Sequence, residues 1–181
     1  MRQLEDAKAE IEVVRVKYGY IQVDDPSLTY VSRFPSEWAF AYRVVVPAGS
    51  RYMLHLTDQV LVDGKQSKGS GTTKSISLNG WRDGSDAVLS YEFDTAGKPP
   101  TLVVRCNADD FFNYAPPDWK SGTRSVNGRG LQIDTGEQEA FSIDETIEFM
   151  YRENPATKRG LRLWLEPYPA YKARQKKKDA A

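Results

Sequence analysis

The chain has little of the side-chain chemistry that most metal sites and many active sites use. It contains one cysteine and one histidine in 181 residues. A single cysteine excludes an internal disulfide framework, and one histidine with one cysteine cannot supply the usual ligands of a zinc or iron site. The sequence therefore predicts no zinc or iron centre and no cofactor.

Net charge and long apolar runs are also absent. Lys plus Arg and Asp plus Glu number 25 each, so the overall charge gives no reason to expect a nucleic-acid partner. No run of 18 or more apolar residues occurs, and no secretory signal is visible at the start. The sequence thus predicts no membrane-spanning helix within these residues.

Aromatic residues, in contrast, make up 12% of the chain, and many of them lie in stretches of alternating polarity. The stretch Trp38–Thr57 alternates in this way on both sides of a Pro-Ala-Gly-Ser turn, which is typical of two strands with one buried face. We predict a hairpin here, at the centre of the core. Its inward rows are Trp38, Phe40, Tyr42, Val44 and Val46, then Tyr52, Leu54 and Leu56.

Period-two patterning continues to the end of the chain and predicts the fold class. We expect a mainly β fold, an antiparallel β-sandwich or jelly-roll-like domain of about eight to eleven strands with one N-terminal α-helix. The domain spans residues 19–168. Besides the hairpin, strands are expected at Tyr20–Val23, Thr29–Phe34, Lys74–Leu78, Ala87–Phe93, 102–106, 131–133, 147–152 and 161–165.

Three segments are expected to lie outside the sheets. The glycine-rich stretch Gln59–Lys74 has Ser70 where a phosphate-binding loop needs lysine, so it is predicted to be a flexible surface loop. Asn79-Gly80 and Asp83-Gly84 predict turns on either side of Trp81. The C-terminal segment, residues 169–181, is basic and has no core-forming pattern, which favours a solvated tail over contact with an anionic surface.

The long connection Asn107–Arg129 carries a group of aromatic residues and shows no clear strand or helix pattern. Connections of this length are uncommon unless they are functional or disordered. Two interpretations remain open: the rings fold over an open end of the core, or they form a stacking platform for a carbohydrate or another partner. The candidate ligand-binding residues are Phe111, Phe112, Tyr114 and Trp119.

Residues 1–18 are predicted to form a helix with an apolar seam. The seam residues are spaced 3, 4, 3 and 4, as at the a and d positions of a heptad. The helix is either docked on the domain or part of a coiled-coil stalk, because the seam is shorter than the three or four heptads that identify a coiled coil. The seam consists of Leu4, Ala7, Ile11, Val14 and Tyr18.

No residue pattern identifies a catalytic site. His55 is the only histidine, and no nucleophile-elbow motif accompanies any serine. Cys106 lies on an apolar strand face, which favours an inert core thiol. The pairs Asp24-Asp25 and Asp109-Asp110 leave calcium binding or a carboxylate-pair hydrolase open, although a turn is the favoured reading of the first pair.

The order of these features resembles a known group of proteins. The heptad helix is followed by YGYIQVDDPS and then by WAFAYRVVVPAGSRYML. This arrangement is similar to uncharacterised single-span membrane proteins of planctomycete bacteria, most closely over Leu4–Leu54 and more weakly near Phe149–Pro167. The resemblance implies a coiled coil, a β-rich domain outside the cytoplasm, and membrane attachment through a helix upstream of the residues given. It assigns no functional residue.

Together these observations predict a non-enzymatic interaction or scaffold domain displayed on a helical stalk. Residues 1–18 are expected to bind a protein partner or a second copy of the chain. A carbohydrate-binding module built on the aromatic connection is the alternative, and a carboxylate-pair hydrolase is the third hypothesis.

Overall fold

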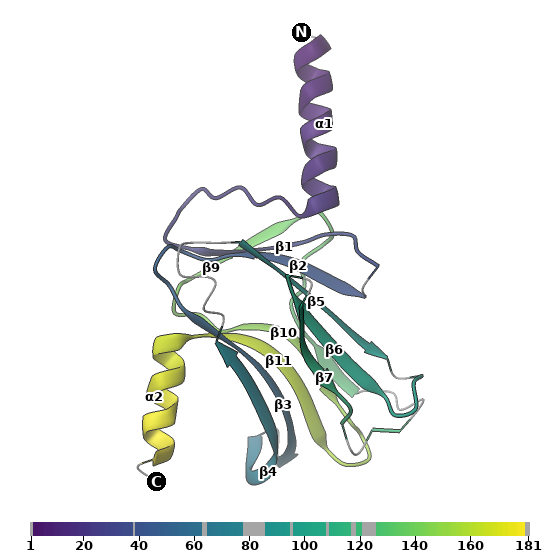
Figure 1. The fold of residues 1–181 in the computed structure, drawn as a ribbon, viewed down its shortest axis with the longest axis vertical. Coiled ribbons are helices and arrows are strands. Elements are labelled where there is room, and N and C mark those ends of the chain that lie inside the picture. The colour runs from purple at the N-terminus through teal and green to yellow at the C-terminus, as the bar shows by residue number, and fades with distance from the viewer. Residues whose placement is uncertain are drawn as a thin grey trace.

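Two antiparallel sheets pack face to face, with one helix at each end of the chain (Figure 1). This computed structural model describes residues 2–37, 39–62, 65–77, 86–94, 96–107, 109–116, 119–120 and 126–179. The predicted fold class, a mainly β sandwich with an N-terminal helix, is confirmed. The predicted helix is α1, Arg2–Tyr18.

The first sheet has six strands in the order β7-β6-β5-β2-β1-β9, and the second has five in the order β4-β3-β11-β10-β8. Within the described residues, every pairing between named strands is antiparallel. In the first sheet the strands are β1 (Thr29–Arg33), β2 (Phe40–Val45), β5 (Asp86–Asp94), β6 (Thr101–Cys106), β7 (Asp109–Tyr114) and β9 (Gln138–Phe141). In the second they are β3 (Tyr52–Val62), β4 (Lys65–Ser77), β8 (Val126–Arg129), β10 (Ile147–Glu153) and β11 (Arg159–Pro167).

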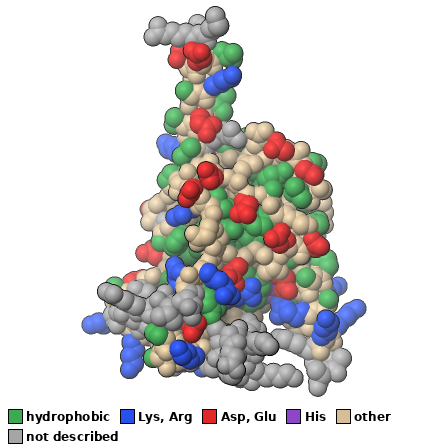
Figure 2. All heavy atoms as spheres, turned by 180° about the vertical axis from the view of Figure 1, so that it is seen from behind, with side chains coloured by type: hydrophobic (Ala, Val, Ile, Leu, Met, Phe, Trp, Pro, Cys, Tyr) green, Lys and Arg blue, Asp and Glu red, His purple; other side chains and the backbone are tan. Residues whose placement is uncertain are grey.

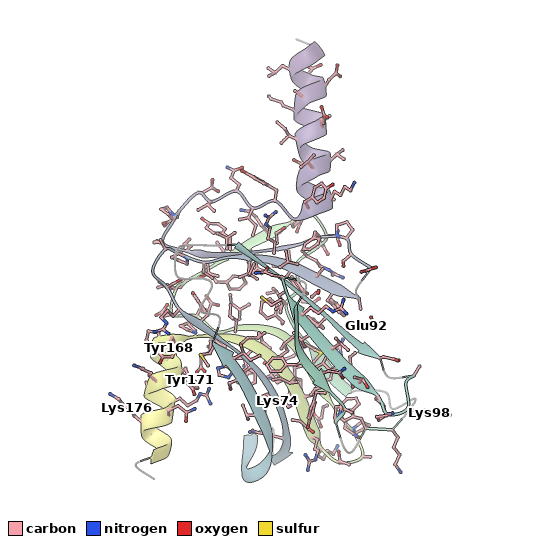
Figure 3. The ribbon with its side chains drawn as sticks, viewed as in Figure 1. Lys74, Glu92, Lys98, Tyr168, Tyr171 and Lys176 are labelled. Atoms are coloured by element: carbon pink, nitrogen blue, oxygen red, sulfur yellow. The ribbon has the colours of Figure 1, made fainter. Side chains whose placement is uncertain are left out.

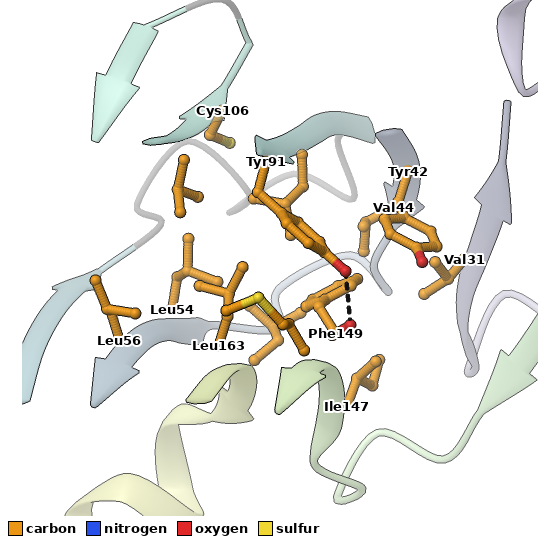
Figure 4. Packing of buried hydrophobic residues seen from close by; sticks show 14 of the residues in the cluster. Val31, Tyr42, Val44, Leu54, Leu56, Tyr91, Cys106, Ile147, Phe149 and Leu163 are labelled. Carbon is orange, nitrogen blue, oxygen red and sulfur yellow. Dashed lines mark hydrogen bonds between the residues drawn. The ribbon is translucent and has the colours of Figure 1, made fainter. Parts of the chain in front are cut away.

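The core lies between the two sheets and takes its side chains from alternate positions of the inner strands. Tyr42, Leu54 and Phe149 are fully buried there. The Tyr91 hydroxyl, from the first sheet, donates to the Phe149 carbonyl oxygen of the second at 2.8 Å (Figure 4). Since each large buried side chain contributes about 1.5–3 kcal/mol, this interleaved layer is the main source of stability.

The predicted central hairpin is wrong in its pairing, although its inward rows are buried as expected. β2 pairs with β1 and β5, whereas β3 pairs with β4 and β11, so the two strands belong to opposite sheets. The turn at residues 47–50, closed by Ser50 N donating to Pro47 O at 3.1 Å, carries the chain across the sandwich. Alternation predicts which face of a strand is buried, but it does not identify the neighbouring strand. Trp38 lies outside the described residues.

Two segments that were predicted to be loops contain strands. Residues 59–62 complete β3 and residues 65–74 form most of β4, whose ladder runs from Met53 opposite Ser77 to Val62 opposite Lys65. The connection from Asn107 to Arg129 contains β7 and β8. In both cases pairing with a neighbouring strand outweighs weak local strand propensity. The turns predicted around Trp81 lie outside the described residues.

Three further segments differ from the sequence-based expectation. Tyr20–Val23 and residues 131–133 are not strands, although Ile21 and Ile133 are buried. The predicted basic tail forms helix α2, Tyr168–Asp179. Ala, Gln, Arg and Lys are good helix formers and Pro169 suits the first turn, so α2 forms without an apolar stripe. The strand chosen for residues 147–152 is confirmed as β10.

Candidate functional site

Helix α1 projects away from the sandwich and carries most of the exposed large apolar side chains of the described residues (Figures 1 and 2). Its predicted seam faces solvent: Leu4 is 63% exposed, Ile11 59%, Val14 46% and Tyr18 54%. A helix docked on the domain would bury this seam, so the docked-helix interpretation is wrong. The seam is instead available to a partner.

The base of α1 is held by specific contacts at residues 16–19. The Arg43 guanidinium donates to the Tyr18 carbonyl oxygen at 3.2 Å, which satisfies one of the last carbonyls of the helix. Gly19 ends the helix with φ of 62° and is covered by Phe34. A methyl group at Gly136 would lie 3.0 Å from the Val16 side chain, so these residues are close neighbours. The helix therefore leaves the domain at a defined joint.

Replacing Gly19 with alanine tests this joint. An added Cβ would lie 2.7 Å from Phe34 Cδ1, and the left-handed backbone is unfavourable for alanine. We expect Gly19→Ala to lower the free energy of unfolding by about 2–3 kcal/mol. Gly49→Ala is the matched control, since Gly49 has φ of 75° with nothing within 4 Å of the added methyl, and should cost about 1 kcal/mol. Equal losses in urea titrations would contradict the close packing of Phe34 on Gly19.

Two hollows flank the lower half of α1 where the helix meets the domain. One has a volume of about 410 Å³ and is lined by Ala7, Glu10, Ile11, Val14 and Tyr20. The other, of about 570 Å³, lies on another face of the helix beside Val13 and Pro35. The first contains three seam residues, and Tyr20 extends its apolar surface onto the domain. This hollow therefore lies along the seam, beside the domain.

The aromatic residues predicted to bind a ligand do not form one exposed platform. Phe112 and Trp119 are each 3% exposed and belong to the core, so neither ring has a free face. Tyr114 is partly buried, and its hydroxyl donates to Asp58 Oδ2 at 2.9 Å. The side chain of Phe111 lies outside the described residues. For Phe112 and Trp119 the structure agrees with rings that cover the core.

A polar cluster that the sequence did not predict lies on the outer face of the second sheet. His55 on β3 is fully buried, and its Nδ1 lies 2.6 Å from the Ser75 Oγ on the neighbouring strand β4. Its Nε2 lies 2.9 Å from Glu166 Oε2 on β11, without hydrogen-bond alignment. Arg174 on α2 donates to both oxygens of Glu166, at 3.2 and 2.6 Å. The cluster connects three strands of the sheet to the helix.

Aromatic rings enclose the imidazole of this cluster. Trp164 stacks on His55 with ring centroids 4.9 Å apart. Tyr171 of α2, labelled in Figure 3, lies with its ring centroid 5.6 Å from that of His55. Burial lowers the pKa of His55 to about 4, and Arg174 and Arg162 act in the same direction, while Glu166 opposes them. The imidazole is therefore neutral at pH 7.

The order serine, histidine and glutamate resembles a catalytic triad, but the contacts of these side chains join the sheet to α2. Acid-base catalysis near neutral pH needs a base whose pKa lies near the working pH, and His55 titrates well below it. Glu166, which would stabilise an imidazolium, already accepts hydrogen bonds from two nitrogens of Arg174. The cluster fixes α2 on the sheet. The sequence did not reveal this cluster, because it does not show that Ser75 lies opposite His55 on the neighbouring strand.

A third hollow, of about 350 Å³, lies where the β2–β3 turn, the β9–β10 turn and the start of α2 meet. Its walls are mainly apolar and include Tyr52, Ile143 and Tyr168. The Tyr52 hydroxyl is 2.6 Å from the Thr29 Oγ1 and 3.2 Å from the Ile143 carbonyl oxygen. The Tyr52 hydroxyl therefore holds the wall of this hollow together.

The acidic pair that left calcium binding open is occupied by local hydrogen bonds. Asp25 Oδ1 accepts from both the backbone nitrogen and the hydroxyl of Ser27, at 2.8 and 2.7 Å, and these bonds lower the pKa of Asp25. This agrees with the predicted turn. Among the described residues, no group of three His, Cys, Asp or Glu side chains is placed to hold a metal ion. The side chains of Asp109 and Asp110 lie outside the described residues.

Comparisons with known proteins do not add a family assignment. No protein-family model, no curated protein and no solved structure matches this chain. In the part of the chain that the structure describes, no helix is both long and apolar enough to cross a membrane.

Proposed function

We propose that this chain is a non-enzymatic interaction domain carried on a helical stalk, and that α1 is the surface through which it associates. The observation that carries the proposal is the seam of α1, which is exposed along its whole length on a helix that projects from the domain. Monomeric proteins rarely leave contiguous apolar surface uncovered without a use for it.

The spacing of the exposed residues indicates the kind of partner. Apolar residues that alternate three and four apart bring one stripe of a helix against another helix, with side chains interlocking as knobs in holes. A helix of this length is marginal in water by itself, so association through the seam also stabilises it. The contacts at Arg43 and Gly19 hold the helix at the base, which leaves the seam clear of the domain.

A change in association state tests the proposal. The unmodified chain is expected to show concentration-dependent self-association in sedimentation equilibrium. Ile11→Asp places a charge in the seam and should weaken association about 100-fold, because burying that charge costs several kcal/mol.

Val13→Asp is the matched control. Val13 is 64% exposed and lies outside the seam, so its replacement should leave the association constant within about threefold of the original value. Circular dichroism at equal concentration checks that both variants keep their β signal. A chain that is monomeric over the whole concentration range, or equal weakening by the two variants, would contradict the proposal.

A further inference from the structure

The residues beside the seam of α1 are basic on one flank and of mixed charge on the other. With Leu4, Ile11 and Tyr18 at position a of the heptad, Ala7 and Val14 occupy position d. Lys8 and Arg15 then occupy position e on one flank, and Glu10 and Lys17 occupy position g on the other. Residues at e and g lie next to the seam and determine partner choice and orientation in coiled coils.

These charges distinguish the two ways in which identical helices can pair. In a parallel pair, position g of one helix faces position e of the next heptad on the other, so the heptad pattern places the position of Glu10 opposite that of Arg15 in the partner copy. In an antiparallel pair, position e faces position e, which brings basic residues together. Opposite charges at this spacing attract and like charges repel by similar amounts.

We propose that α1 pairs with α1 of a second copy of this chain, in parallel and in register. The inference rests on the proposed function and adds the identity and orientation of the partner. The partner helix lies along the hollow formed by Ala7, Glu10, Ile11 and Val14, with Tyr20 of the domain at its lower end. Pairing places each seam residue opposite the same residue of the other copy.

Parallel pairing has a structural consequence for the two domains. Both sandwiches lie at the same end of the paired helices, because each is joined to its helix at Gly19. The defined joint at Tyr18 and Arg43 limits how far each domain turns relative to its helix. Two copies therefore present their domains side by side.

Engineered disulfide bonds distinguish the two orientations. In the parallel pair Leu4 lies opposite Leu4, whereas in the antiparallel pair it lies opposite Val14, about ten residues or 15 Å along the helix from the first position. We expect Leu4→Cys alone to form a covalent dimer in glutathione buffer. Mixing Leu4→Cys with Val14→Cys should give no excess of the mixed dimer over the two self-linked dimers.

Two controls accompany this experiment. The unmodified chain has only Cys106, which is 3% exposed, and should stay monomeric under denaturing, non-reducing conditions. Val13→Cys places an exposed thiol off the seam and should cross-link at least about tenfold more slowly than Leu4→Cys if pairing is specific, since tenfold corresponds to about 1.4 kcal/mol.

Each outcome decides a different point. If only the mixture cross-links, the helices are antiparallel, which overturns this inference and leaves the proposed function intact. If the chain self-associates but neither experiment gives a seam disulfide above the Val13→Cys control, α1 does not pair in register, which also overturns the inference. A chain that remains monomeric contradicts the inference and the proposed function together.

A charge exchange provides a second test that needs no cysteine. Glu10→Lys faces a basic residue of the partner copy and should weaken association about fivefold. Adding Arg15→Glu to the same chain restores opposite charges and should return the association constant to within about twofold of the original. A double variant that is weaker than the single variant would overturn the assignment of this pair.

Discussion

Replacing Phe149 with alanine is expected to lower the free energy of unfolding by about 3–5 kcal/mol, the usual cost of removing a large aromatic side chain from a packed core. Phe149 on β10 is 1% exposed. Its ring lies 5.4 Å from that of Tyr42 in the opposite sheet. The variant therefore leaves a cavity between the sheets, where both lose contacts. Equilibrium unfolding in urea, followed by tryptophan fluorescence, measures the change.

Two neighbouring variants show whether the loss is specific to the core. Ile143→Ala changes a side chain that is 46% exposed in the preceding turn, and should cost less than about 0.5 kcal/mol. Tyr91→Phe keeps the ring but removes the donor to the Phe149 carbonyl oxygen, and should cost about 1–2 kcal/mol. A loss below about 1 kcal/mol for Phe149→Ala would contradict the packing of one sheet on the other.

The second large effect is a loss of stability when the pH falls below 6.5. The pKa of His55 is about 4 in the folded protein, because burial and two arginines oppose its protonation. It is about 6.5 in the unfolded chain. Between these values the unfolded chain binds a proton that the folded chain does not bind. Stability attributable to His55 is therefore complete above pH 6.5, falls as the pH is lowered, and is lost by about pH 4, a total of about 3 kcal/mol.

Because the chain has a single histidine, this prediction can be checked directly. The imidazole proton resonance in NMR should titrate near pH 4 in the folded protein. The free energy of unfolding should fall by about 2 kcal/mol between pH 6.5 and 5. His55→Gln provides the comparison: this variant is less stable, but its stability should be nearly constant over the same interval. An ordinary histidine pKa near 6.5 would show that α2 does not cover His55 as described.

The predicted fold class was correct because burial faces are encoded locally. Val44, Leu54 and Leu163 each lie in a stretch where apolar and other residues alternate, and each is fully buried. Alternation is a short-range signal that survives without knowledge of the neighbouring strands. Alternation does not indicate which strands pair with one another. For this reason β2 and β3 were predicted to form one hairpin, although the chain crosses between the two sheets there.

The missed elements depend on contacts between distant residues. β4 is rich in glycine, serine and lysine, and forms because β3 provides a long ladder beside it. Helix α2 is attached through Tyr171 and Arg174, which contact His55 and Glu166 on two different strands. No local pattern contains that information, since an apolar stripe is absent from α2.

The candidate sites were predictable to different extents. The seam of α1 was visible from residue spacing alone. Its exposure was not, because only the structure shows that no part of the described domain covers it. The aromatic connection was a weaker signal, because a ring that stacks on a ligand and a ring that fills a core have the same composition. The structure places Phe112 and Trp119 in the core, which the sequence alone did not decide.

The N-terminal end of α1 and the C-terminal end of α2 lie at opposite ends of the molecule (Figure 1). A fluorescent protein or an enzyme fused after α2 would be carried at the pole farthest from the seam. In a parallel pair, two such cargoes would point in the same general direction without obstructing the stalk. A fusion after α2 would therefore leave the proposed pairing surface of α1 free.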